Sequence, residues 1–312
     1  MVVSAESLAT AAGVEVLQGG GNAVDAAAAV GFVLAVTYPE AGNLGGGGFM
    51  LIRLTGGVAT MVDFRETAPE VATRDMFLDG DGIFVPEKTR LGSLAAGVPG
   101  AVAGLLHALD TYGTKTRAEV MRRAIDLAEQ GFRVSDRLAK SLRSARLDSN
   151  QSISARNAFV RNGTLLIEGD TLVQPDLAKT LRAIRDRGKA GFYEGTVADL
   201  IVAEMKSGGG IITHNDLLKY KAVERKPVSG SYRGYDILSS SPPSAGGIVL
   251  LEMLNILERF DLHGKGWNSA AAIHLLAAAA QRAYADRAEF IGDPEFVEVP
   301  TPDLISKTYG WI

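Results

Sequence analysis

The stretch GNLGGGGFMLIR, residues 42–53, joins four consecutive glycines to an apolar run. Glycine loses more backbone freedom on folding than other residues, so such a run is expected where the backbone lies very close to another group or takes a positive φ. The apolar residues that follow have the composition of a buried strand. A second such run, residues 58–64, leads into DFRE, residues 63–66. The two runs predict a hairpin that turns at Gly56-Gly57 and ends in a cluster of charged groups.

Helical patterns surround this hairpin. Residues 8–17 and 23–36 predict two helices, the second capped by Asn22 and apolar on almost every side, which indicates burial. From Gly100 onward helical periodicity dominates, and the pattern of residues 229–238 predicts a short strand pair. The further helices are expected at residues 117–130, 135–145, 175–187, 195–206, 214–220, 249–259 and 269–290. Helices and strands with apolar faces in this order predict a layered α/β sandwich.

The composition excludes several classes of protein. The net charge of −4 argues against a nucleic-acid partner, which would require a basic face. The chain has no cysteine, and none of its four histidines stands at metal-ligand spacing, so neither a metal nor a cofactor is expected. The most apolar segment, residues 26–36, is too short to span a bilayer, and no signal peptide is visible at the start. No membrane association is therefore expected.

Arg65 is the first candidate for a binding residue. Alternation along a strand places Met61, Asp63 and Arg65 on one face, and the planar guanidinium of arginine matches a carboxylate. The alternative is an ion pair of Arg65 with Asp63 or Glu66 on the surface, which is the more frequent role of such a residue. The residues alone favour this second interpretation.

Two glycine-containing loops also invite a functional interpretation. The run of residues 45–48 either lines a substrate site or permits tight packing, and packing is the favoured interpretation. It lacks the lysine and hydroxyl residue of a phosphate-binding loop. The loop SSSPPSAGG, residues 239–247, either forms an oxyanion nest or is a plain turn before a helix, and the turn is favoured.

Three motifs together resemble a known family. GNLGGGGFMLIR, DFRETAP (residues 63–69) and YADR (residues 284–287) are similar to the large subunit of bacterial gamma-glutamyltranspeptidases. The resemblance runs from Met1 to about the last ten residues. In that family the arginine of the DFRETAP motif holds the α-carboxylate of the γ-glutamyl group, and it falls on Arg65 here.

The resemblance implies a fold and a partner. It implies one intertwined four-layer αββα sandwich of the N-terminal-nucleophile hydrolase type, completed by a small subunit. Residues 1–99 would form the sandwich portion, and residues 100–312 a mainly helical portion with a strand pair near 229–238. The family's nucleophile is the N-terminal threonine of the small subunit, released by autoprocessing, so no catalytic residue is expected in this chain. The chain is then expected to be an obligate heterodimer subunit and unstable alone.

The activity implied is cleavage of glutathione and other γ-glutamyl compounds, with transfer of the glutamyl group to water, amino acids or peptides. Two alternatives stay open: a related acylase acting on glutaryl or cephalosporin side chains, and a homologue that binds without catalysis. The family also implies a periplasmic or secreted location.

Overall fold

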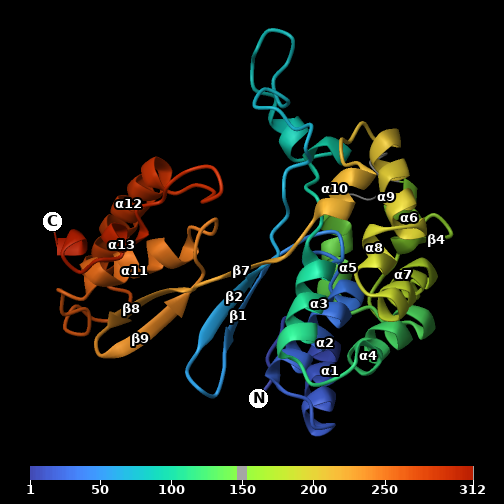
Figure 1. Cartoon of the computed structure of the whole chain (residues 1–312), viewed down its shortest axis with the longest axis horizontal. Coiled ribbons are helices and arrows are strands. Elements are labelled where there is room, and N and C mark those ends of the chain that lie inside the picture. The colour runs from blue at the N-terminus through green and yellow to red at the C-terminus, as the bar shows by residue number, and fades with distance from the viewer. Residues whose placement is uncertain (146–152, 312) are drawn as a thin grey trace. The chain divides into compact units, whose positions relative to one another are not determined.

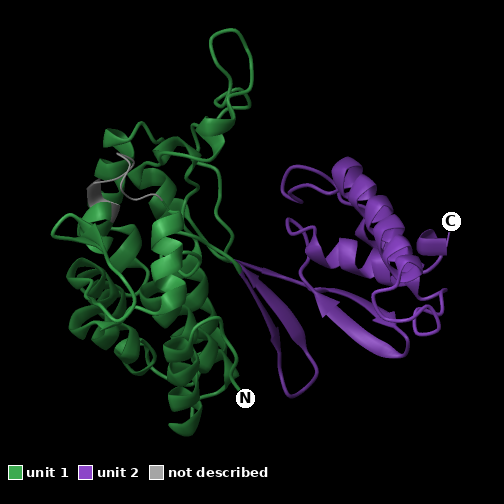
Figure 2. Ribbon diagram, turned by 180° about the vertical axis from the view of Figure 1, so that it is seen from behind, with its two compact units in different colours: residues 1–48, 64–222 green, residues 49–63, 223–312 purple. Residues whose placement is uncertain are grey.

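The computed structural model describes residues 1–145 and 153–311 and divides the chain into two compact units (Figure 2). Unit 1 comprises residues 1–48 and 64–222, and unit 2 comprises residues 49–63 and 223–312. Neither unit is a single continuous stretch, so the chain passes from one unit to the other at residues 48/49, 63/64 and 222/223.

Two N-terminal helices lie side by side in unit 1 (Figure 1). They are α1 (Ser7–Gln18) and α2 (Ala23–Thr37), which confirms both helices expected here. Asn22 caps α2 as predicted, because its side chain accepts hydrogen bonds from the amides of Val24 and Asp25. Ten of the fifteen residues of α2 are buried, as predicted for most of the helix, whereas Ala27, Val30, Gly31 and Leu34 share one face and are only half-buried.

Further helices of unit 1 pack on this pair. α3 (Ala101–Tyr112) and α4 (Arg117–Gln130) contact α2, and α7 (Pro175–Arg187) contacts α4. The other elements of unit 1 are short or peripheral: η1 (Pro86–Thr89), η2 (Ser93–Ala95), β3 (Phe132–Arg133), α5 (Asp136–Ser144), α6 (Ile153–Phe159), β4 (Val160–Arg161), β5 (Thr164–Leu165), β6 (Thr171–Leu172), α8 (Ala190–Tyr193), α9 (Thr196–Ser207) and α10 (His214–Lys219).

The predicted hairpin belongs to unit 2. β1 (Phe49–Arg53) pairs antiparallel with β2 (Ala59–Asp63), and Gly57 takes a positive φ of 85° in the turn. β7 (Val223–Arg225) adds to the other edge of β2, giving the order β1-β2-β7. The third strand comes from a distant part of the chain, so local sequence patterns gave no sign of it.

A second layer of unit 2 is built on another hairpin. β8 (Val228–Tyr232) and β9 (Tyr235–Ser239) form the expected strand pair, and α11 (Gly246–Leu257) packs on both strands. α12 (Ala270–Phe290) packs on α11, and α13 (Thr301–Leu304) and η3 (Tyr309–Trp311) follow. The core of this layer consists of Val228, Ile248, Leu251 and Leu304.

The start of α11 differs from the prediction. The helix begins at Gly246 rather than at residue 249, because glycine pairs are poor helix formers and the sequence pattern discounts them. Gly247 is required by packing: a Cβ there would lie 2.1 Å from the carbonyl oxygen of Ser240.

Candidate functional site

Phe64 anchors the backbone that carries Arg65. The amide of Phe64 donates a 3.0 Å hydrogen bond to the carbonyl of Gly48, and the amide of Gly48 donates one of 3.3 Å in return. The ring of Phe64 is buried and lies directly on α3, where a Cβ at Gly104 would come within 2.0 Å of it. Because β2 ends at Asp63, Arg65 lies just past the strand, and its side chain is exposed.

The glycine run packs against the same backbone. A Cβ at Gly47 would lie 2.4 Å from the carbonyl oxygen of Phe64 and 2.8 Å from the amide nitrogen of Glu66. The carbonyl of Gly46 accepts hydrogen bonds of 2.8 Å from the amides of Gly100 and Ala101. At Gly47 the packing interpretation is therefore right.

Gly45 differs from the rest of the run. The nearest atom to a Cβ at this position would be 4.0 Å away, so no neighbour of this chain requires glycine there. Packing within this chain thus requires glycine at position 47 but not at position 45.

Two stacked tyrosines support the segment from the other side. The hydroxyl of Tyr220 donates a 2.7 Å hydrogen bond to the carbonyl of Arg65, and its ring stacks on that of Tyr193 at 5.8 Å between centroids. The buried hydroxyl of Tyr193 donates to the carbonyl of Pro99 at 2.8 Å and accepts from the amide of Ala103 at 3.2 Å. Burial raises the pKa of Tyr193 far above its usual range, so this phenol stays neutral and keeps donating.

Neither tyrosine was predicted as part of the site. Tyr193 is the last residue of α8 and Tyr220 directly follows α10, and an isolated tyrosine in such a pattern carries no local signal for a contact so far along the chain.

The residues that follow Arg65 are also fixed. Thr67 and Val98 form a backbone bridge with hydrogen bonds of 2.8 and 3.3 Å. The amide of Glu70 donates a 2.8 Å hydrogen bond to the carboxylate of Asp216. Partial burial acts to raise the pKa of Asp216, but hydrogen bonds from Thr213 and Glu70 outweigh it and lower the pKa overall. Asp216 therefore remains an ionised acceptor near neutral pH.

Asp63, the acid of the same motif, is paired within unit 2. Its carboxylate lies 2.7 Å from Nε of Arg225 on β7, and both side chains are largely buried. This pair joins the last residue of β2 to the strand beside it. The local sequence suggested Arg65 as a partner of Asp63 and gave no sign of Arg225, which lies 162 residues away.

The remaining candidate groups have structural roles. In the loop of residues 239–247, the hydroxyls of Ser240 and Ser244 lie 2.9 Å apart and α11 follows at Gly246, as expected for a turn before a helix. Asp286 of the YADR motif accepts a 3.0 Å hydrogen bond from the hydroxyl of Tyr309 and so fixes α12 to η3. His214 lies 2.9 Å from a carboxylate oxygen of Asp199, exposed on the surface.

The described residues assemble no metal site. Across residues 1–145 and 153–311, no three His, Cys, Asp or Glu side chains come together where they could hold an ion. In the same ranges, no helix combines the length and apolarity needed to cross a bilayer.

Arg65 offers an exposed guanidinium on a backbone that several hydrogen bonds and close contacts hold in place, which suits binding of a carboxylate group.

One family model and several curated relatives match nearly the whole chain. The family model described as Gamma-glutamyltranspeptidase matches residues 9–311. The chain is 52% identical over 313 residues to the glutathione hydrolase proenzyme of Escherichia coli (strain K12), covering 99% of this chain and 54% of that proenzyme. It is 40% identical over 316 residues to the acylase ACY 1 proenzyme of Pseudomonas sp. (strain V22), covering 99% of this chain and 57% of that proenzyme.

A solved structure is also very similar. The crystal structure of Helicobacter pylori gamma-glutamyltranspeptidase superimposes with a TM-score of 0.97 at 49% identity, covering 99% of this chain and 89% of that one. The chain spans about half the length of the curated relatives it matches.

Proposed function

The chain belongs to the gamma-glutamyltranspeptidase family, and from that premise we propose that it is the large subunit of an enzyme that cleaves γ-glutamyl amide bonds. The substrates we propose are glutathione and related γ-glutamyl compounds. The glutamyl group passes to water or to the amine of an amino acid or peptide.

The family also settles the fold class. The α/β fold predicted from the sequence pattern, and its N-terminal-nucleophile hydrolase type, which the family resemblance implied, are confirmed. We propose that residues 1–99 supply the sandwich portion of the mature enzyme and residues 100–312 the mainly helical portion.

The placement of Arg65 is the observation that carries the proposal. Its side chain is exposed, while its backbone is held by Gly47, Phe64 and Tyr220. A guanidinium presented by such a backbone binds a carboxylate through two parallel charge-assisted hydrogen bonds. We assign Arg65 to the α-carboxylate of the γ-glutamyl group. The rigid backbone lowers the entropy lost when the substrate is oriented.

The nucleophile comes from a second chain in this proposal. The hydroxyl of the N-terminal threonine of the small subunit attacks the γ-carbonyl carbon, with its own α-amine as the base. The amide C–N bond breaks, the amine leaves with a proton, and an ester to threonine forms. Water or an acceptor amine then attacks the ester and regenerates the hydroxyl.

Two features of unit 2 support an obligate small-subunit partner. In the part of the chain that the structure describes, the sheet β1-β2-β7 has three strands; Leu51 on β1 is 44% exposed, and Val58, just before β2, is 65% exposed. On α12, Ile273, Leu276 and Tyr284 are 49%, 44% and 57% exposed. An open sheet edge with apolar side chains beside it favours pairing with another chain. We further propose a periplasmic or secreted location, as the family resemblance implies.

A second candidate is an acylase of the same superfamily. The 40% identity to an acylase proenzyme favours keeping it. Its acyl groups, such as glutaryl, also end in a carboxylate that Arg65 would bind. They lack the α-amine of glutamate, so the two activities differ in the substrate rather than in the role of Arg65.

Release of p-nitroaniline from γ-glutamyl-p-nitroanilide tests the proposal, using the enzyme produced with its small subunit. Arg65→Ala should lower kcat/KM by about 2–3 kcal/mol, or roughly 30- to 150-fold, because a charge-assisted contact is lost. Arg65→Lys should recover only part of this loss, since lysine lacks the planar fork. Arg74→Ala, at an exposed arginine of the following loop, is the matched control and should keep full activity.

The outcomes separate the candidates. Turnover of the γ-glutamyl compound that depends on Arg65 supports the proposal. Turnover of glutaryl-p-nitroanilide alone identifies the acylase. An inactive pair that still binds glutamate compounds identifies a homologue without catalysis.

A further inference from the structure

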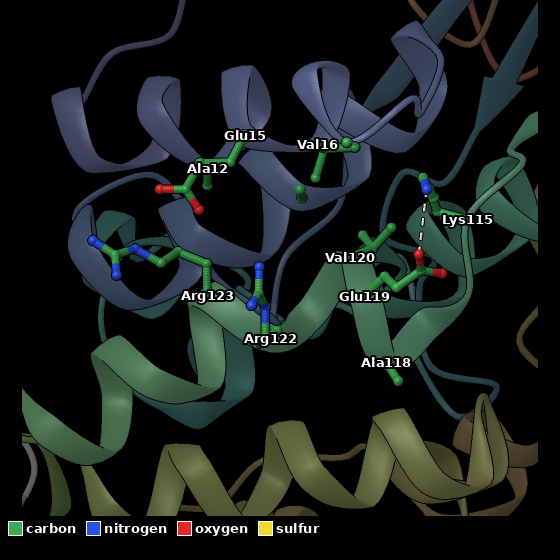
Figure 3. Close-up of a pocket in the computed structure, with 11 residues that line it drawn as sticks. Ala12, Glu15, Val16, Lys115, Ala118, Glu119, Val120, Arg122 and Arg123 are labelled. Carbon is green, nitrogen blue, oxygen red and sulfur yellow. Dashed lines mark hydrogen bonds and ion pairs between the residues drawn. The ribbon is translucent and has the colours of Figure 1, made fainter.

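A cavity of about 450 Å³ opens between α1 and α4 (Figure 3), and the described residues that line it do not include those of the segment that carries Arg65. Its walls include Ala12 and Val16 of α1, Ala29 of α2 and Val120 of α4, so much of its lining is apolar. Cavities that bind small molecules have volumes of roughly 300–1,000 Å³ and similarly apolar linings with a few polar groups.

Charged side chains from both helices lie at this cavity. In Figure 3, Glu15 of α1 and Arg123 of α4 point toward one another, and the guanidinium of Arg122 points into the space between the helices. Nε of Arg123 is buried and has no hydrogen-bond partner among the described residues. A buried donor without an acceptor is rare in native proteins and costs about 1–3 kcal/mol, so it indicates that an acceptor belongs there.

The charges at the cavity leave one positive charge in excess. Nζ of Lys115 and the carboxylate of Glu119 form an ion pair at 3.3 Å and neutralise each other. Glu15 offsets one of the two arginines, Arg122 and Arg123. A ligand with a single negative charge would complete the balance, whereas a dianion would exceed it.

We propose that this cavity binds a small carboxylic acid with a short apolar body. Its carboxylate accepts hydrogen bonds from Arg123 and Arg122, and its apolar part lies on Val16, Ala29 and Val120. Guanidinium groups bind carboxylates in this manner. This proposal stands independently of the reaction proposed for the enzyme.

Isothermal titration calorimetry of the two-subunit enzyme with hexanoate tests it. Hexanoate should bind saturably and at least about tenfold more tightly than the neutral hexanamide, because only the acid supplies the acceptor for Arg123. Arg123→Gln and Arg122→Gln should each weaken binding several-fold. Arg143→Gln, at an exposed arginine on α5, is the matched control and should bind as the wild type does.

A variant that is expected to bind hexanoate more tightly distinguishes a lost contact from misfolding, because misfolding would only weaken binding. Glu15→Gln removes the carboxylate that competes with the ligand for Arg123, so it should tighten hexanoate binding several-fold. Equal binding of hexanoate and hexanamide, or unchanged binding by Arg123→Gln, would overturn the proposal. Inorganic phosphate that binds more tightly than hexanoate, and displaces it, would overturn the choice of a carboxylate.

Discussion

The hydroxyl of Tyr220 donates a hydrogen bond of 2.7 Å to the backbone carbonyl of Arg65, although 155 residues separate the two in sequence. The same tyrosine ring stacks on Tyr193, whose own hydroxyl holds the carbonyl of Pro99. The position of the proposed carboxylate-binding arginine therefore depends on two tyrosines that lie far along the chain.

Removing the Tyr220 hydroxyl should loosen this segment. We expect Tyr220→Phe to lower stability by about 1 kcal/mol, because one hydrogen bond is lost while the ring and its stacking remain. It should also lower kcat/KM for γ-glutamyl-p-nitroanilide several-fold, since Arg65 is held less firmly. Thermal unfolding and steady-state kinetics measure both effects. Tyr235→Phe, at a tyrosine that is 74% exposed, is the control and should change neither. Unaltered kinetics in Tyr220→Phe would show that the tyrosine does not position Arg65.

The glycine run provides a matched pair of substitutions. Gly47→Ala should destabilise the enzyme by about 1–3 kcal/mol, because its Cβ would lie 2.4 Å from the Phe64 carbonyl oxygen and must displace that backbone. Gly45→Ala should stay within about 0.5 kcal/mol of the wild type, since its nearest neighbour is at 4.0 Å. Differential scanning calorimetry of both variants tests the difference. Equal Tm values would mean that packing does not explain the run.

The carboxylate of Asp25 should contribute strongly to the stability of unit 1. Its buried carboxylate accepts from the amides of Asn22, Thr114 and Lys115 at 2.7, 2.8 and 3.0 Å. Burial acts to raise its pKa, but these hydrogen bonds outweigh it and lower the pKa below 3.8. Asp25→Asn should cost roughly 1.5–3 kcal/mol at neutral pH, because a neutral amide accepts more weakly and places a donor against other donors.

The lowered pKa of Asp25 predicts how the stability of the fold changes with pH. A lowered folded-state pKa stabilises the fold above about pH 3.8, and this contribution is lost as the pH falls through the folded value. Urea unfolding from pH 7 to pH 3 should therefore show the gap between wild type and Asp25→Asn shrinking in acid. Asp176→Asn, at a side chain 91% exposed, should show no such gap.

In unit 2, the ionised form of Glu252 should destabilise the fold, which is the opposite of the effect of Asp25. Its side chain is 1% exposed, and neither carboxylate oxygen has a hydrogen-bond partner among the described residues. Burial first, and then the neighbouring carboxyl of Asp286, raise the pKa of Glu252 to about 8, while Arg282 acts in the other direction. The folded state thus retains a proton that the unfolded state releases from about pH 4.5, so stability falls between pH 4.5 and 8.

Glu252→Gln should remove this penalty. We expect the variant to equal the wild type near pH 4.5 and to exceed it in Tm above pH 8, which thermal unfolding across this range measures. Glu258→Gln is the control with the opposite sign, because a hydrogen bond from Lys307 lowers the pKa of Glu258 and its charge stabilises the fold. A Glu252→Gln variant that is less stable than the wild type at pH 9 would contradict the assignment.

Local signals made much of the fold predictable. α4 and α7 were predicted with their observed bounds, because each has a clear start at Thr116 or Pro175 and a glycine, Gly131 or Gly188, directly after its end. The hairpin was equally clear from its Gly56-Gly57 turn. Where glycine is required by packing, as at Gly247 against the carbonyl of Ser240, the propensity pattern placed the helix start too late.

The candidate site was predictable only in part. Arg65 stood out through a motif, whereas its supports at Tyr220 and Tyr193 become visible only when the chain is folded. Likewise, the partner of Asp63 is Arg225, 162 residues away, and no local pattern connects the two. Contacts of this separation depend on topology, which a single sequence does not encode in any short window.

The pairing of β2 with β7 also has a consequence for synthesis of the chain. Residue 63 leaves the ribosome 160 residues before residue 223, so the exposed edge of β2 waits for its third strand. At the usual rate of translation this interval lasts roughly 10–30 s, far longer than a hairpin needs to form. The nascent hairpin thus presents Met61 and Val62 on an unpaired edge throughout that time.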